Sequence, residues 1–298
     1  MKIGIYYAYW EKEWRADYLK YIPKVRQLGF DVLEIACTPL PEMTRQELID
    51  LRQCAKDHGV ILTAGHGPNA GQNLASPDAG IARSAIDFYA DLLKRLDLLD
   101  IRVIGGGIYS YWPVDYSQPI DKTGDWERSV ANVRKVGKMA ADFGIKYCLE
   151  VLNRFEGYLL NTAEEGMRFV QEVDLDSVYL MLDTFHMNIE EDSFSKAIRQ
   201  AGQKLGHFHI GEANRKVPGT GRMPWTEIAD ALIEIQYNGF LVMEPFVQMG
   251  GQVGSDIRIW HDILPDTEEK KLDEDARRSA EFCRSLLHIR SLGFTYAG

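Results

Sequence analysis

Four short apolar segments in the second half of the chain each end at or near a side chain that can act as an acid, a base or a metal ligand. These side chains are Glu150, Asp183, His209 and Glu244. Side chains alternate in direction along a strand, so each can point to the same side as the residue two positions before it. If the segments are neighbouring parallel strands, the four side chains converge on one point at their carboxyl ends.

Three carboxylates that converge in a protein interior would raise one another's pKa values and cost several kcal/mol. A divalent cation removes that cost. Three oxygen ligands and one imidazole nitrogen suit Mn²⁺, Co²⁺ or Mg²⁺ better than metals that prefer thiolates. A lone Glu or His of this kind is usually solvated or hydrogen-bonded in a core, but four in succession favour a metal site. His207 lies two residues before His209, one layer deeper, and we expect it to have a core or supporting role.

Eight short apolar segments alternate with longer amphipathic ones along the chain, and each is typical of a parallel strand buried on both faces. The expected strands are 3–7, 32–36, 60–64, 102–105, 146–151, 178–183, 205–210 and 239–244. The expected helices are 18–28, 44–58, 78–98, 126–143, 162–173, 193–201, 225–235 and 268–292.

Local signals mark the helix ends. Thr44 with Glu47, and Thr162 with Glu165, form the pattern of a capping box. Glycines at 29, 59, 144 and 202 follow helical segments, where a left-handed residue is favoured.

Eight consecutive βα units without a linker predict an α/β fold, a single-domain (β/α)8 TIM barrel over residues 1–298. The alternative is an open doubly wound sheet, but no G-x-G-x-x-G follows the first strand, and the glycines at 105–107 only resemble that motif. The long segments 109–125 and 248–267 are expected to be insertions near the mouth of the active site. The closing segment 294–298 carries no motif.

Composition excludes several classes of protein. The chain has 298 residues, 45% hydrophobic and 26% charged, with a net charge of −10, which argues against a nucleic-acid surface. No segment has the ~20 apolar residues of a membrane span, and the opening segment is too short for a signal peptide. Four scattered cysteines without a CxxC pair indicate reduced thiols. We therefore expect a cytoplasmic protein with no nucleic-acid or membrane partner.

Several motifs together resemble the D-tagatose/D-psicose (allulose) 3-epimerase family of xylose-isomerase-like barrels, closest to its bacterial D-psicose 3-epimerases. The motifs are GIYY at 4–7, GHGP at 65–68, SYWP at 110–113, EVLNRFE at 150–156, LDTFHMN at 182–188, HFHIGE at 207–212 and VMEPF at 242–246. The likeness spans nearly the whole chain, and EVLNRFE is its most specific part.

The resemblance implies metal-dependent C3 epimerisation of a free ketohexose through a cis-enediolate. It implies one Mn²⁺ or Co²⁺ per subunit, with Mg²⁺ as an alternative, and a homodimer or homotetramer. The family's metal ligands correspond to Glu150, Asp183, His209 and Glu244, and its acid–base pair to Glu150 and Glu244. Its contacts with the O1–O3 end of the sugar correspond to Glu156, His186 and Arg215. Its contacts with the far end correspond to Tyr6, Gly107, Trp112 and Phe246.

Other activities stay open at this point. An aldose–ketose isomerase would use the same metal ligands and move a proton between C1 and C2. A three-zinc abasic-site endonuclease fits poorly with seven histidines and an acidic chain. A catalytically inactive sugar-binding regulator would have lost one glutamate of the pair, but both are present. The loop 214–222 could by itself hold a phosphate. We interpret Arg215 instead as a hydrogen-bond donor to a ketose hydroxyl, with Lys216 and Arg222 solvated or interfacial.

Overall fold

The computed structural model describes the backbone of residues 1–295 and side chains through residue 293. The closing residues of the segment 294–298 lie outside the described part. Eight parallel strands form a closed barrel in sequential order. Its strands are β1 (Lys2–Tyr6), β2 (Val32–Ala36), β3 (Ile61–Gly65), β4 (Val103–Gly106), β5 (Lys146–Glu150), β6 (Val178–Asp183), β7 (Leu205–Ile210) and β8 (Phe240–Met243). The barrel predicted from the sequence is confirmed.

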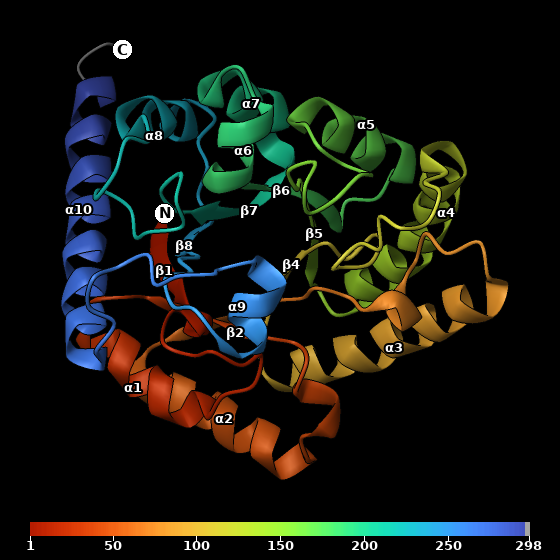
Figure 1. Cartoon of the computed structure of the whole chain (residues 1–298), viewed down its shortest axis with the longest axis horizontal. Coiled ribbons are helices and arrows are strands. Elements are labelled where there is room, and N and C mark those ends of the chain that lie inside the picture. Colours follow the sequence, from red (N-terminus) through yellow and green to blue (C-terminus); the bar gives the residue numbers. More distant parts are fainter. Residues whose placement is uncertain (296–298) are drawn as a thin grey trace.

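Helices surround the barrel, and one short helix lies across its open end (Figure 1). They are α1 (Tyr18–Gln27), α2 (Arg45–His58), α3 (Ala79–Leu98), α4 (Lys122–Asp142), α5 (Ala163–Val173), α6 (Thr184–Glu190), α7 (Phe194–Ala201), α8 (Trp225–Glu234), α9 (Gly251–Ile257) and α10 (Glu269–Thr295). Short 3-10 turns lie at Tyr7–Tyr9, Leu40–Glu42, Ala70–Gln72 and Gly202–Lys204. None of the described helices is long and apolar enough to cross a membrane.

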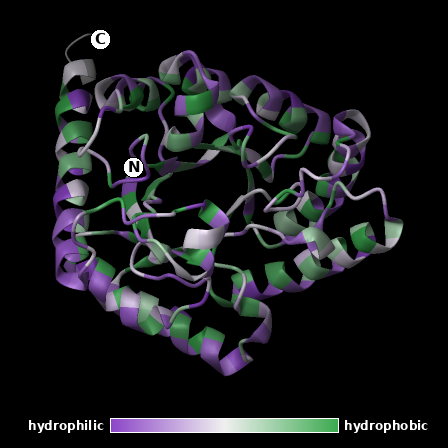
Figure 2. Ribbon diagram, viewed as in Figure 1, coloured by the Kyte–Doolittle hydropathy of each residue, from purple (hydrophilic) through white to green (hydrophobic). Residues whose placement is uncertain are grey.

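Apolar packing between the strands and the outer helices holds the barrel together. Side chains such as Ile5, Leu33, Leu93 and Phe169 are fully buried in one continuous core. Most of the outer helices show both green and purple segments in Figure 2, as expected when one face packs on the barrel and the other meets solvent. This packing fixes the strand ends from which the polar residues of the site project.

The capping signals are confirmed in part. At α2, Thr44 and Glu47 form the complete reciprocal capping box. At α5, Thr162 accepts the hydrogen bond from the Glu165 amide, but the Glu165 carboxylate accepts from the amide of Asn161 instead of Thr162. The second capping box is therefore only half formed. The four glycines that follow helices all have positive φ, as expected.

Candidate metal centre and active site

Four potential metal ligands meet at the carboxyl ends of neighbouring strands. Glu150 and Asp183 end β5 and β6, His209 is the penultimate residue of β7, and Glu244 directly follows β8. One ligand atom from each lies within 4.8 Å of those of the other three. Three of the side chains are buried, and that of Glu244 is 16% exposed. The strand pattern thus brings together the residues expected from the sequence.

The donor set of this cluster fits a divalent cation. Burial raises the pKa of Glu150 well above its ordinary value, and the charge of Glu244 raises it further. Glu150 Oε1 and His209 Nδ1 are both buried without a hydrogen-bond partner. A cation bound between them would use both atoms and offset the repulsion among the three carboxylates.

Beneath this cluster lies a buried glutamate that the sequence analysis did not identify. Glu34 of β2 accepts hydrogen bonds of 2.6 Å from His209 Nε2 and of 2.6 Å from His207 Nε2. Thr63 Oγ1 donates a third hydrogen bond, of 2.7 Å. Burial raises the pKa of Glu34, but the two histidines outweigh it and hold that pKa below its ordinary value. Its signal in the sequence was an acidic residue in the middle of the apolar segment VLEIA.

A second histidine faces the cluster from α6. His186 Nδ1 accepts a hydrogen bond of 3.2 Å from the backbone amide of Asn153. A neutral ring therefore carries its proton on Nε2, which lies 3.7 Å from Asp183 Oδ2 and 3.9 Å from Glu150 Oε1. Burial lowers the pKa of His186, which favours this neutral form. The Nε2–H is thus directed into the site without a close acceptor.

Arg215 supplies the main positive charge of the site. Its guanidinium lies 3.0 Å from Glu244 Oε2 and 3.3 Å from both Asp183 Oδ2 and Glu156 Oε1. Burial raises the pKa of Glu156. The positive charge of Arg215 and the electrostatic effect of His186 outweigh this effect, so the pKa lies below its ordinary value. Arg215 is only 4% exposed. It is therefore a buried partner of the acidic cluster and not a solvated loop cation.

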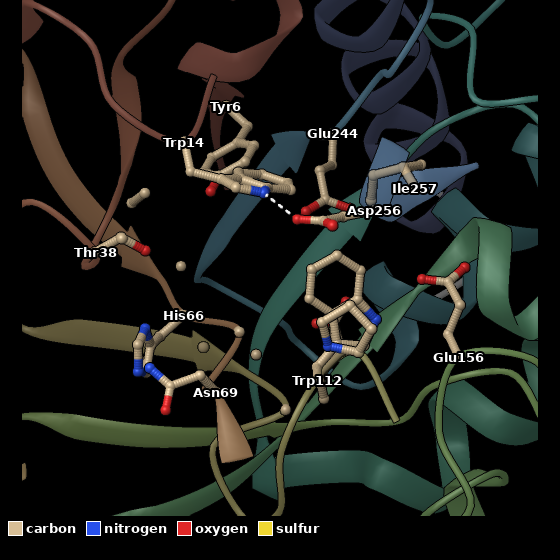
Figure 3. Close-up of a pocket in the computed structure, with 18 of the residues that line it drawn as sticks. Tyr6, Trp14, Thr38, His66, Asn69, Trp112, Glu156, Glu244, Asp256 and Ile257 are labelled. Atoms are coloured by element: carbon tan, nitrogen blue, oxygen red, sulfur yellow. Dashed lines mark hydrogen bonds between the residues drawn. The ribbon is translucent and has the colours of Figure 1, made fainter. Parts of the chain in front are cut away.

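A pocket of about 640 Å³ opens above the cluster. Every residue that the resemblance assigned to the sugar lines it, namely Tyr6, Gly107, Trp112, Glu156, His186, Arg215 and Phe246. In Figure 3, Glu156 and Glu244 lie toward one end of the pocket, and His66 and Asn69 lie toward the other. Polar groups lie at the end of the pocket next to the four-residue cluster, and aromatic side chains form its walls. This lining suits a small hydrophilic ligand with an apolar edge.

Two residues that the sequence analysis did not name join loops across this pocket. Trp14 Nε1, from the loop after β1, donates a hydrogen bond of 2.8 Å to Asp256 Oδ2 of α9 (Figure 3). The Trp14 ring also makes edge contacts with Trp112 and Phe246, with ring centroids 6.0 and 6.1 Å apart. Loops after β1, β4 and β8 thus form one aromatic wall.

The chain is similar to a known family of barrels and to several characterised proteins. Residues 22–286 match the family model described as xylose isomerase-like TIM barrel. The chain is 60% identical to a D-psicose 3-epimerase of Ruminiclostridium cellulolyticum, over 96% of this chain and 98% of the relative. A crystal structure of D-psicose 3-epimerase with D-tagatose, from Clostridium cellulolyticum, superposes with a TM-score of 0.96 at 60% identity and covers 96% and 99% of the two chains. A D-psicose 3-epimerase crystallised in the presence of D-fructose gives 0.95 at 53% identity, with 96% and 99% covered.

Proposed function

The chain belongs to the xylose isomerase-like TIM-barrel family, and within it to the D-psicose 3-epimerases, and from this premise we propose how its site inverts C3 of a ketohexose. The observation that carries the proposal is the convergence of Glu150, Asp183, His209 and Glu244, with ligand atoms within 4.8 Å of one another. We propose that these side chains hold one divalent cation. Once bound, the cation would act as a Lewis acid that stabilises negative charge on the sugar by several kcal/mol.

Glu150 and Glu244 form the proposed acid–base pair. Inversion requires that a proton leave one face of C3 and that another arrive on the opposite face, whereas a single fixed base tends to return the proton to the face it came from. The two glutamates project from β5 and β8, which β6 and β7 separate in the barrel, so they can flank a sugar between them. One removes the C3 proton and the other delivers a proton, each contributing roughly 10²–10⁴-fold.

The neighbouring polar side chains orient the reacting end of the sugar. His186 directs an Nε2–H into the site, and Arg215 holds further N–H donors beside Glu244. Asn153 Nδ2 donates a hydrogen bond of 3.0 Å to Glu156 Oε1, which fixes that carboxylate. These groups suit the oxygens on C1 to C3, while Tyr6, Gly107, Trp112 and Phe246 enclose the far end of the sugar.

Three carboxylates and one imidazole favour Mn²⁺ or Co²⁺, with Mg²⁺ as the weaker alternative, because imidazole prefers the transition metals. We expect exhaustive chelation to abolish activity and Mn²⁺ or Co²⁺ to restore it. Because a ligand at 100 times its Kd adds about 2.7 kcal/mol to stability, the Tm should fall by roughly 5 °C on metal removal. The proposal would be contradicted if the protein kept full activity after metal analysis had shown that it contained no divalent metal.

The substrate class is a free ketohexose. The related structures with D-tagatose and in the presence of D-fructose support this class. The decisive assay follows solvent deuterium into D-fructose and D-psicose during turnover. Deuterium should enter at C3. Entry at C1 or C2 without exchange at C3 would instead indicate an aldose–ketose isomerase. We further propose that residues 1–298 form one catalytic domain that assembles as a homodimer or homotetramer in the cytoplasm, which light scattering and cell fractionation would test.

A further inference from the structure

We propose that Glu34 is a positioning residue that presents the Nδ1 lone pair of His209 to the cation site. This inference rests on the proposed function only in that the cluster binds a cation. Glu34 is fully buried in the barrel interior and lies on β2, whereas His209 lies on β7. The carboxylate therefore reaches across the barrel to the histidine, and the contact is not one between neighbouring strands.

The strands around Glu34 leave room for this reach. A Cβ added at Gly65 of β3 would lie 3.4 Å from Glu34 Oε1. A Cβ added at Gly105 of β4 would lie 2.4 Å from Met181 Sδ and 3.3 Å from His207 Cδ2. Larger residues at these two positions would crowd the side chains that pack around the carboxylate. The space is shaped for one carboxylate between two imidazoles.

The hydrogen bonds determine which ring nitrogen of His209 is free. A carboxylate only accepts hydrogen bonds, so the 2.6 Å contact with Glu34 Oε1 requires a proton on His209 Nε2. In a neutral ring this leaves a lone pair on Nδ1. That atom lies 3.5 Å from Glu244 Oε1 and 3.8 Å from Glu150 Oε1, and it has no hydrogen-bond partner. Glu34 thus selects the one tautomer that can bind a metal in this cluster.

Two further donors fix the carboxylate itself. His207 Nε2 and Thr63 Oγ1 both donate to Glu34 Oε2, which leaves Oε1 for His209. This gives His207 a function in the deeper layer that the sequence assigned to it, as part of the support under a ligand. Partners of this kind typically change metal affinity by 10–100-fold when they are removed.

The variants Glu34→Gln and Glu34→Asp separate positioning from packing. Glutamine fills the same space, but its amide NH₂ replaces one of two accepting oxygens. It either faces His209, which favours the wrong tautomer, or faces His207 and Thr63, which then no longer fix the group. Aspartate is smaller and leaves a void, but it still only accepts hydrogen bonds. A positioning role predicts that Gln weakens metal binding more than Asp does, whereas a packing role predicts the reverse order.

The experiment measures the Kd for Mn²⁺ and Co²⁺ by chelator competition on metal-stripped protein. It also measures ¹⁵N shifts of the His209 ring without metal, assigned by comparison with His209→Asn. Glu34→Gln should weaken binding 10–100-fold and move the His209 proton toward Nδ1. The matched control is Glu212→Gln, because Glu212 is also a buried carboxylate, with hydrogen bonds from Trp225 Nε1 and the Gly219 amide. It should lower the Tm but keep the metal affinity and the ring shifts.

Several results would overturn the proposal. One is a Glu34→Gln protein that binds metal within twofold of wild type. Another is a loss of affinity in Glu212→Gln as large as that in Glu34→Gln. If Glu34→Gln does not fold, the wild-type spectrum still decides, because a neutral His209 ring with its proton on Nδ1 would contradict the inference. No substrate is used, so failure of the epimerase assay leaves these outcomes readable.

Discussion

At the scale of residues, the two histidines of the site owe their orientation to neighbours that are not metal ligands. The Asn153 amide donates to His186 Nδ1, so Nε2–H of that ring faces the site. Glu34 accepts from His209 Nε2, so Nδ1 of that ring faces the site. One ring therefore offers a donor and the other an acceptor, although both are imidazoles in the same pocket.

The sequence predicted that the four proposed ligands converge, because each stands at or next to a strand end, a place defined by local patterns. It did not assign roles to Glu34 or Asn153. Glu34 lies in mid-strand, and its partners on β7 are more than 170 positions away along the chain. Asn153 contacts His186 and Glu156 through its backbone amide and its side chain, and both partners come within reach only because the loop after β5 folds over the site. Contacts of this kind follow from how the barrel closes and not from any local signal.

Replacement of either proposed acid–base residue should nearly abolish turnover. Glu150→Gln and Glu244→Gln each keep the shape of the side chain but remove the proton-transfer group, so kcat should fall at least ~10²-fold. Circular dichroism should show the fold intact. His207→Asn should affect kcat less and stability more, since His207 supports Glu34 from below. If both Gln variants keep more than about a tenth of the wild-type rate, the two-carboxylate mechanism is wrong.

His66 should make the protein sensitive to acid. Burial lowers its pKa from 6.5 to about 4, with a smaller opposite effect of Gln72. The unfolded chain therefore binds this proton first, and the free energy of unfolding falls as the pH drops from about 6.5 to about 4. Between pH 7 and 5, the free energy of unfolding of metal-free wild type should fall by about 2 kcal/mol more than that of His66→Gln. Urea unfolding at the two pH values measures this difference. Equal losses of stability in wild type and His66→Gln would contradict this prediction. The variant His288→Gln is the control, because it removes an imidazole that is exposed to solvent.

At the scale of elements, the sequence located strands better than loops. The bounds of β2, β6 and β7 match those predicted, because strands buried on both faces are continuous apolar segments. The helix predicted at 126–143 begins four residues earlier, at Lys122, where Asp121 caps it. The helices α6 and α9 were not predicted, because seven residues are too few to show a helical period.

The contact between Trp14 and Asp256 should hold α9 over the pocket. Asp256→Ala removes a hydrogen bond worth about 1 kcal/mol, so KM for the ketose should rise about fivefold, with a smaller change in kcat. Trp14→Phe should have a similar effect, and the double variant should be no worse than either single one. Asp142→Ala serves as the control, because Asp142 is the exposed last residue of α4 and does not line the pocket. Additive effects of the two substitutions on KM would show that the residues act independently.

At the scale of the whole molecule, the acidic character of the chain extends into its pocket. Five acidic and two basic side chains line the pocket, and the chain carries a net charge of −10. Both basic side chains are paired, Arg15 with Glu42 and Arg215 with the acidic cluster. A bound divalent cation offsets part of this negative charge, but no unpaired cation lines the pocket in the described structure to receive an anionic substituent.

In the described structure, the helix that follows β8 offers no free N-terminus for a phosphate. Barrels that bind phosphate often use a short extra helix after the last strands, and α9 occupies that place. Its first amides are already used, because Gln252 N donates to Glu13 Oε1 and Val253 N to the Lys12 carbonyl. A Cβ added at Gly251 would lie only 2.1 Å from that carbonyl oxygen, so the loop after β1 packs directly against this end of α9.

These features predict that the protein discriminates against sugar phosphates. In the loop 214–222, Arg215 is buried against carboxylates and Arg222 is exposed, so the loop does not form the phosphate cradle that its composition suggests. We expect kcat/KM for D-fructose and D-psicose to exceed that for their 6-phosphates by at least ~10-fold, since one unpaired charge costs more than about 1.4 kcal/mol. The measurement uses one buffer with saturating metal and adds inorganic phosphate to wild type as a control for metal sequestration. A preference for the phosphates would mean that the pocket admits an anion despite its acidic lining, and would leave the metal site and the C3 chemistry unaffected.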